Sequence, residues 1–341
     1  MHLVKKYSIE LILFFIGLIV LGFIFFKTSK NSPVSPDVSP TPFPFAEMTI
    51  PYLRNRTYQS SLGDLKYLSE NQAYTSYLTS YDSDSLQIFG LLTKPKGDVP
   101  KSGWPVIIFI HGYIPPAEYR TAVNYSSYVD YLARNGFVVF KIDLRGHDNS
   151  QGEAGGAYYS ADYIIDTLNA YAVLQNSDFV DSTKIGLWGH SMAGNVILRS
   201  LAAKPEIPAA VIWAGAVFSY SDMQKYGIND GSYQPPPNNS NRQRKRSELR
   251  NLYGDFDPES PFWQQVTPVN YLNDLKGALM LNHAIDDNVV NIGYSRDLIE
   301  LLNKAQVLSE LKEYPSGGHN LTGVSFTNAM QNTVEFFRSH L

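Results

Sequence analysis

Residues 185–194 read Ile-Gly-Leu-Trp-Gly-His-Ser-Met-Ala-Gly, an apolar run that breaks into small residues around Ser191. A serine that attacks a carbonyl carbon projects from a sharp turn between a strand and a helix, where a bulky residue two positions away would clash. Gly189 and Ala193 hold these two positions, and Gly194 further relieves crowding. The stretch therefore predicts a nucleophile elbow with Ser191 at its tip. Because so short a pattern also arises by chance, the flanking sequence must supply the rest of the site.

A candidate oxyanion loop lies upstream. Residues 105–110 form a short apolar run rich in β-branched residues, which predicts a buried parallel strand, and the loop after it begins with His111. The tetrahedral intermediate of acyl transfer carries a negative oxygen that backbone N–H groups stabilise. We assign these donors to Tyr113 and to Met192, the residue after the serine. His111 and His190 are interpreted as structural.

A candidate acid follows a third apolar strand, residues 278–283. Ligand-facing residues collect at the carboxyl ends of such strands, and Asp286 and Asp287 lie there. We predict Asp286 as the acid, because the Asp-x-x-Val spacing would let Val289 fold under the sheet. Asp287 is the alternative.

A candidate general base is His319, which follows two glycines in a loop after the strand expected at residues 310–314. The glycines provide a loop that can bring the imidazole to Ser191, and Pro315 ends the strand. The chain order is then serine, acid and histidine, which is one of the known orders of a catalytic triad.

Strands alternate with helices along this part of the chain. The expected helices are residues 125–135, 161–175, 193–203 and 295–304, and the further strands are 138–142, 184–188 and 209–213. Parallel strands need such crossovers. The pattern predicts an α/β fold with a doubly wound, mostly parallel sheet, in one catalytic domain over residues 47–341.

One segment, Val217 to Gln265, breaks the alternation. It is long and polar, and within it residues 242–250 carry a run of five basic residues, namely Arg242, Arg244, Lys245, Arg246 and Arg250. Long loops in compact domains are commonly functional, so we expect a lid or cap over the site. The basic run could attract an anionic substrate, but the solvated face of a cap helix is the favoured interpretation.

The amino-terminal segment differs in composition from the rest of the chain. Residues 11–26 are apolar and uncharged, and as a helix they would span about 24 Å at 1.5 Å per residue. Together with flanking residues this predicts a single membrane anchor within residues 1–30. A cleaved signal peptide is the rival interpretation, but no small-x-small cleavage site follows, so an uncleaved signal is the remaining alternative. The Ser/Pro-rich residues 31–46 predict an extended linker that holds the catalytic domain on the extracytoplasmic side.

The composition limits the binding partners and cofactors that we expect. The net charge of −4 argues against general nucleic-acid binding. The sequence has no cysteine, no Gly-rich phosphate loop and no Cys/His metal cluster, so we expect neither a metal nor an organic cofactor.

Taken together, these motifs resemble the α/β-hydrolases, and within them the catalytic domain of the prolyl oligopeptidase (S9) and dienelactone-hydrolase-like group. The resemblance runs from about residue 74 to 341 and includes an early hairpin at 81–90, the Asp-Leu-Arg-Gly-His loop at 143–147, the elbow, the acid loop and Gly-Gly-His. It implies a triad of Ser191, Asp286 and His319. Loop 143–147 is interpreted as a structural brace.

Substrate class is less constrained. Peptidases that resemble this domain generally carry a large amino-terminal propeller, whereas here only a short stretch separates the linker from the first family strands. This favours a carboxylic ester hydrolase that acts on a small molecule. A serine peptidase acting on short peptides is the alternative. Polyester or cutin-like hydrolysis and a non-catalytic, membrane-tethered binding module are lesser alternatives.

Overall fold

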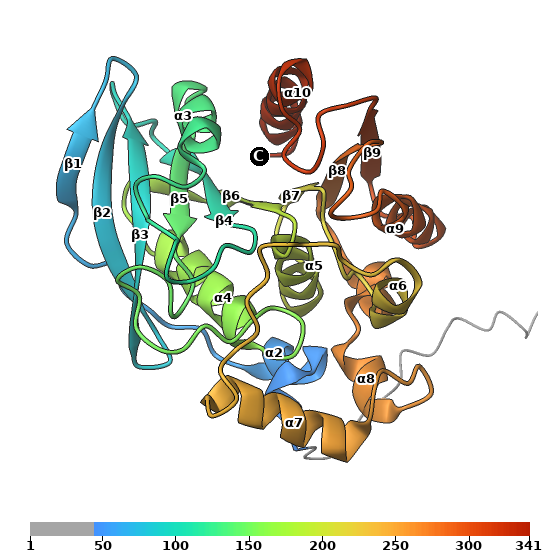
Figure 1. Ribbon diagram of the computed structural model, residues 1–341. Helices are drawn as coiled ribbons and strands as arrows, with labels where there is room; N and C mark the ends of the chain where they lie inside the picture. The colour runs from blue at the N-terminus through green and yellow to red at the C-terminus, as the bar shows by residue number, and fades with distance from the viewer. Residues whose placement is uncertain (1–43) are drawn as a thin grey trace, which may run out of the picture. The chain divides into compact units, whose positions relative to one another are not determined.

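A mixed β-sheet organises the computed structural model, which describes residues 44–341. Within this range the sheet has nine strands in the order β1-β2-β3-β5-β4-β6-β7-β8-β9 (Figure 1). Their bounds are β1 Lys66–Glu70, β2 Tyr74–Ser83, β3 Leu86–Pro95, β4 Trp104–Ile110, β5 Val138–Ile142, β6 Val180–His190, β7 Ala209–Trp213, β8 Ala278–Ala284 and β9 Ser309–Tyr314.

The strand order reverses in the middle of the sheet. Strands β1, β2, β3 and β5 pair antiparallel, and every pairing from β5 through β4 to β9 is parallel. The chain passes from β4 to β5 on one side and returns to β6 on the other. The carboxyl ends of β4 and β6 therefore flank the switch point, which is where ligands bind in open α/β sheets.

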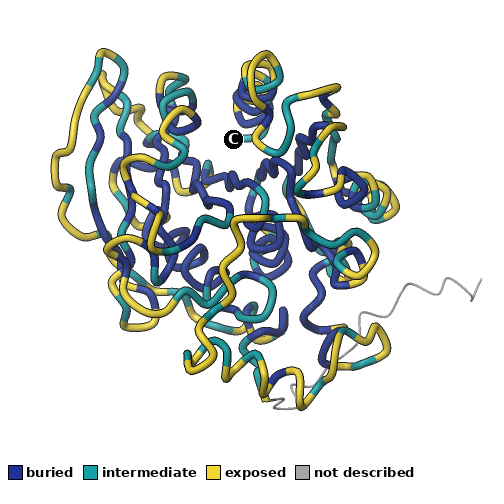
Figure 2. The backbone as a smooth tube through the Cα atoms, in the orientation of Figure 1, coloured by how far each residue is buried: buried dark blue, intermediate teal, exposed yellow. Residues whose placement is uncertain are grey.

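Helices cover both faces of the sheet (Figure 1). Their bounds are α3 Ser126–Arg134 and α10 Val324–His340 on one face, and α4 Asp162–Gln175, α5 Ala193–Ala203 and α9 Gly293–Lys304 on the other, where the short α2 Ile50–Asn55 packs on α5. Alternate residues of β4 enter two separate cores, Ile108 with α4 and α5 and Phe109 with α3 and α10. Figure 2 shows β5 and β7 buried along their whole length and β4 buried from Val106 onward. Burial on both faces accounts for their almost entirely apolar sequences, in which Lys141 of β5 is the exception.

The segment between β7 and β8 is largely helical. It contains α6 Tyr220–Tyr226, α7 Asn241–Tyr253, α8 Pro261–Val266 and the 3-10 helix η2 Pro268–Asp274. Ser219 and Asp222 form a reciprocal capping box at the start of α6, and the Ser240 side chain caps α7. The expected cap is therefore an ordered element built on serine-capped helices.

The elements expected from sequence agree with the structure to within a few residues. The prediction of an α/β fold with a mostly parallel sheet is confirmed, as is the early hairpin, now seen as β2 and β3. The predicted membrane anchor at residues 11–26 lies outside the described residues. Within residues 44–341, no helix combines the length and apolarity needed to cross a membrane.

Candidate active site

Ser191 occupies the turn between β6 and α5. Its φ of 58° lies in the left-handed region, which non-glycine residues rarely adopt. The backbone is held there because Ser191 N donates to Trp213 O at 2.9 Å and Ser191 O accepts from Gly194 N at 2.9 Å. A Cβ atom at Gly189 would lie 2.7 Å from the Cβ of Ala193, so glycine is needed at that position. The elbow geometry predicted from sequence is present.

His319 pairs with Asp287. The two side chains extend from the loops after β9 and β8, and His319 Nδ1 lies 2.8 Å from Asp287 Oδ2. The Asp287 side chain is fully buried, and its Oδ1 accepts from the backbone N–H groups of Val289 and Val290 at 2.9 and 3.0 Å. A buried carboxylate on Nδ1 fixes the imidazole tautomer that leaves Nε2 free to accept a proton.

The structure corrects the predicted acid. Asp286 does not contact the imidazole; its carboxylate accepts from the backbone N–H groups of Gly318 at 2.8 Å and Gly317 at 3.3 Å. The Asp-x-x-Val spacing predicted that Val289 would fold under the sheet and that Asp286 would be the acid. The structure instead buries Val290 fully and leaves Val289 half-buried, so the same spacing counts back to Asp287. The turn after β8 therefore directs Asp287 inward and Asp286 to the surface, where it supports the loop of the histidine.

A second histidine touches the same carboxylate. His283, buried at the end of β8, places Nε2 3.2 Å from Asp287 Oδ2 and 2.9 Å from Val290 O. Burial opposes ionisation of Asp287, but the hydrogen bonds from His283 and His319 outweigh it and hold the pKa of this carboxyl below its usual range. Asp287 is therefore ionised at neutral pH. Sequence reasoning missed His283, because residues four positions apart are neighbours on a helix and not across the end of a strand and the turn that follows it.

Tyr113 and Met192 follow the two strands that flank the switch point. Both residues line the same cavity as Ser191. Among the hydrogen bonds of residues 44–341, neither backbone N–H of these two residues has a protein acceptor. Both positions are compatible with the oxyanion donors predicted from sequence.

A chain of hydrogen bonds connects the three loops of the site. Gly112 N donates to the Tyr125 hydroxyl at 3.0 Å, and this hydroxyl lies 2.8 Å from His190 Nδ1. His190 Nε2 in turn lies 2.8 Å from His319 O. Burial lowers the pKa of His190 to about 3, so the ring is neutral and its Nε2–H can donate. His190 thus has the structural role expected of it, whereas the role of Tyr125 was not foreseen.

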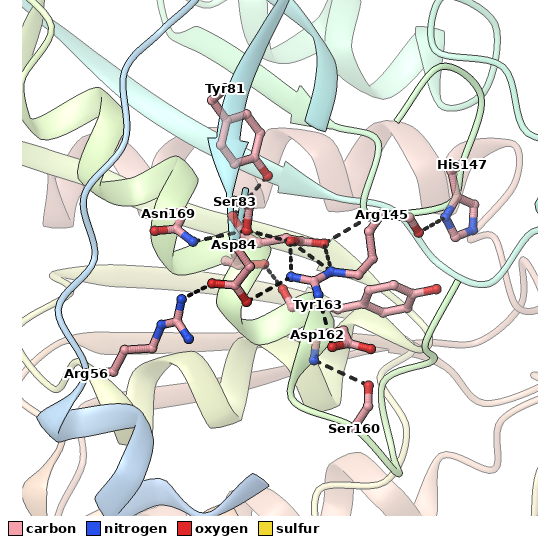
Figure 3. Close-up of polar contacts among 12 residues, drawn as sticks. Arg56, Tyr81, Ser83, Asp84, Arg145, His147, Ser160, Asp162, Tyr163 and Asn169 are labelled. Atoms are coloured by element: carbon pink, nitrogen blue, oxygen red, sulfur yellow. Dashed lines mark hydrogen bonds and ion pairs between the residues drawn. The ribbon is translucent and has the colours of Figure 1, made fainter. Parts of the chain in front are cut away.

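The loop at residues 143–147 acts as a brace beside the oxyanion loop. His111 Nε2 lies 3.2 Å from Asp143 O, and the His111 ring stacks on Tyr119 with centroids 4.3 Å apart. Arg145 extends into a network of carboxylates (Figure 3). There its guanidinium contacts Asp166 at 2.7 Å, Asp162 at 3.1 Å and Asp84 at 3.6 Å. The network fixes the loop.

A cavity of about 270 Å³ adjoins Ser191. Its walls come from the oxyanion loop, from residues 155–159 and from the cap, which contributes Met223, Ile228, Asp230, Tyr233, Arg242 and Arg246. The cap is attached to the oxyanion loop, because the Tyr113 hydroxyl accepts from Gln234 N at 2.8 Å. No group of three or more potential metal-binding side chains occurs within the part of the chain that the structure describes.

The sheet order, the helices on both faces and the elbow at the switch point define an α/β-hydrolase. The chain belongs to the prolyl oligopeptidase family, because the Peptidase_S9 family model matches residues 123–341, which is more than half of the chain. The resemblance noted from the motifs is confirmed, and the protein is a hydrolase of this family.

Relatives include both peptidases and esterases. The chain is 24% identical to the uncharacterized peptidase YtmA of Bacillus subtilis over 256 residues, which cover 74% of this chain and 90% of that protein. The acylaminoacyl peptidase of Pyrococcus horikoshii superposes with a TM-score of 0.59 at 17% identity, covering 79% of this chain and 42% of that one. Acetyl xylan esterase 1 of Thermoanaerobacterium superposes with a TM-score of 0.57 at 20% identity, covering 88% of this chain and 95% of that one.

The lengths of these proteins differ. The chain spans less than half of the dipeptidyl and acylaminoacyl peptidase structures that it matches, but nearly all of the acetyl xylan esterase structures. At identities of 20% or below, these likenesses show a shared fold.

Proposed function

We propose that the protein is a serine hydrolase that cleaves carboxylic esters of small molecules. The observation that carries the proposal is the His319–Asp287 pair at 2.8 Å, together with a serine held in a left-handed turn at the switch point of the sheet. A nucleophile, a general base and an orienting carboxylate are the three groups that nucleophilic acyl transfer requires.

The chemistry follows from these positions. His319 accepts the proton of the Ser191 hydroxyl at Nε2 as the oxygen attacks the carbonyl carbon. Asp287 stabilises the imidazolium that forms, and the N–H groups of Tyr113 and Met192 donate to the oxyanion. His319 then returns the proton to the leaving alcohol, and water hydrolyses the acyl-enzyme by the same route. The non-glycine residue in a strained φ is consistent with an exposed nucleophile at the tip of the elbow.

The size of the cavity favours small esters over peptides. The cavity beside Ser191 is small, about 270 Å³ against roughly 300–1,000 Å³ for pockets that hold drug-sized ligands. Nearly the full length of the acetyl xylan esterase of Thermoanaerobacterium is covered by the chain, but so is 90% of the peptidase YtmA. Family membership and the peptidase relatives support a peptidase of short substrates as the second candidate.

Matched kinetic assays distinguish the two candidates. We expect the purified full-length chain to hydrolyse short p-nitrophenyl esters and to leave alanine and proline p-nitroanilides intact, with ester turnover lost in Ser191→Ala. Cleavage of the nitroanilides at a comparable kcat/KM would identify a peptidase. Absence of turnover and of Ser191-dependent labelling by a fluorophosphonate probe would indicate a binding module.

A membrane anchor at residues 11–26 is part of the proposal, and its support is the uncharged apolar sequence alone. We expect the full chain to stay with membranes after alkaline carbonate extraction and to be accessible to protease added from outside the cell. Release into the soluble fraction by carbonate would contradict the anchor, and protection from the protease would contradict the extracytoplasmic orientation.

A further inference from the structure

The basic residues of α7 divide into two groups. Arg244, Lys245 and Arg250 are exposed, as the favoured interpretation of a solvated helix face requires. Arg242 and Arg246 are half-buried and line the cavity that contains Ser191. Because they are four residues apart, their side chains share one face of the helix, and this face is directed at the site.

Within the described residues 44–341, these two guanidinium groups have no acidic partner. Across residues 44–341, no carboxylate lies within ion-pair distance of Arg242 or Arg246. Glu153 contacts only the backbone N–H of Arg242, at 3.3 Å. Asp230 lines the same cavity, but its Oδ1 accepts from Ser232 N and Oγ at 2.9 and 2.6 Å. The charged lining, two arginines against one aspartate, leaves one positive charge in excess.

Neutral groups lie next to both side chains. The guanidinium carbon of Arg246 lies 4.7 Å from the centroid of the Tyr159 ring, and its Nη1 lies 3.4 Å from the Tyr233 hydroxyl. A Cβ atom at Gly156 would lie only 2.6 Å from Arg242 Nη2, so the glycine admits the close approach of that guanidinium. Arg246 is thus positioned by aromatic contacts and Arg242 lies against the backbone of Gly156, and both keep N–H donors available for a ligand.

We propose that Arg242 and Arg246 form a subsite that binds a carboxylate of the substrate while Ser191 attacks its ester or amide carbonyl. The inference rests on the proposed function. Arginine suits this role because its planar fork donates to both oxygens of a carboxylate. The carboxylate could stand on the acyl side of the scissile bond, as in a monoester of a dicarboxylic acid, or on the leaving-group side, as at the free C-terminus of a short peptide.

Two matched pairs of substrates distinguish a carboxylate on the acyl side from one on the leaving-group side. On the acyl side, the monoester of adipic acid with p-nitrophenol is compared with p-nitrophenyl hexanoate, and on the leaving-group side p-carboxyphenyl acetate is compared with phenyl acetate. For each pair the readout is the ratio of kcat/KM for the anionic ester to that for the neutral ester. The full-length chain is compared with Arg242→Gln and Arg246→Gln, and with Arg244→Gln and Lys245→Gln as controls from the exposed face of the same helix.

We expect each of the two inward variants to lower the ratio by about 10-fold to 100-fold in one substrate pair, since a hydrogen bond to a charged group is lost. The two control variants should keep the ratio of the unaltered chain. The affected pair identifies the side on which the carboxylate stands. Turnover that depends on Ser191 with an unchanged ratio in both inward variants would overturn the subsite and leave the hydrolase intact. Absence of turnover of all four esters, with no fluorophosphonate labelling, would overturn both.

Discussion

His283 and His319 approach the same oxygen of Asp287 from two sides, with nitrogen-to-oxygen distances of 3.2 and 2.8 Å. Only His319 is partly exposed, whereas His283 is sealed between Ser295 Oγ at 2.8 Å and Val290 O at 2.9 Å. The inner histidine therefore fixes the direction of the carboxylate, and through it the imidazole that faces the substrate.

His283 is expected to act as a positioning residue. In His283→Gln the Asp287 carboxylate loses one donor and gains freedom to rotate, so we expect kcat to fall about 10-fold while KM stays within about twofold. Steady-state kinetics on p-nitrophenyl acetate provide the measurement. A comparable rise in KM, or a loss in kcat no greater than that of a fully exposed control such as Lys304→Gln, would show that the contact is structural only.

Substitutions of the two adjacent aspartates are expected to lower kcat by very different amounts. Asp287→Asn removes the charge that stabilises the imidazolium, and we expect kcat to fall about 10³- to 10⁴-fold. Asp286→Asn keeps an amide oxygen that can accept from the glycine loop, so we expect a loss below about 10-fold. Both are measured as kcat on the same ester. Near-equal losses, or the larger loss at Asp286, would contradict the pairing seen in the structure.

Tyr125→Phe is expected to weaken the connection between the oxyanion loop and the histidine loop. It leaves Gly112 N–H without an acceptor, which costs about 1–3 kcal/mol when the group is buried. We expect a lower urea midpoint together with a drop in kcat of about 10-fold. Tyr58→Phe is the matched control, because its hydroxyl donates to Leu53 O at 2.9 Å, outside the three loops of the site. An unchanged kcat in Tyr125→Phe would mean that the chain of bonds supports folding alone.

Acid should begin to destabilise the fold as soon as the pH falls below 6.5, the pKa of the free histidine side chain. Burial lowers the pKa of His190 to about 3 and that of His147 to about 4, from 6.5 for the free side chain. As the pH falls below 6.5 the unfolded chain binds these protons and the native chain does not, so stability is lost as pH falls and is complete above 6.5. Asp143 partly offsets this loss of stability. Burial raises its pKa to about 6, so in acid the native chain binds a proton at this residue before the unfolded chain does.

We therefore expect the urea midpoint to be lower at pH 5 than at pH 7, and the difference to shrink in His147→Asn. Each unit of lowered pKa corresponds to about 1.4 kcal/mol. Intrinsic fluorescence would follow unfolding at both values of pH. Equal midpoints for the unaltered chain would show that His147 and His190 are not held neutral by the fold.

Local signals predicted most of the fold. The apolar strands at residues 105–110 and 209–213 could be recognised because a strand buried on both faces must be apolar throughout. The elbow was recognisable because its small residues are imposed by contacts within the same turn, such as Gly189 against Ala193. The helix after Ser191 was placed at Ala193–Ala203 for the same reason, and the structure has these bounds.

The misassigned parts of the site depend on contacts between distant segments. Asp286 and Asp287 are adjacent, and only the direction of the turn after β8 decides which one faces His319. Tyr125 and His190 are 65 positions apart, so no window of sequence contains their hydrogen bond. Charge alone could not distinguish Arg242 from Arg244, because what separates them is the side of α7 that packs toward the cavity.

The bond between the Tyr113 hydroxyl and Gln234 N joins a residue that flanks the nucleophile to the segment that covers it. The cap is thus not an independent module. An engineered chimera that received its cap from another family member would keep the geometry of its oxyanion loop only if the donor also supplied a backbone partner for this hydroxyl. Specificity and catalytic competence would then have to be transferred together. The transferred unit would consist of the segment between β7 and β8 and of Tyr113.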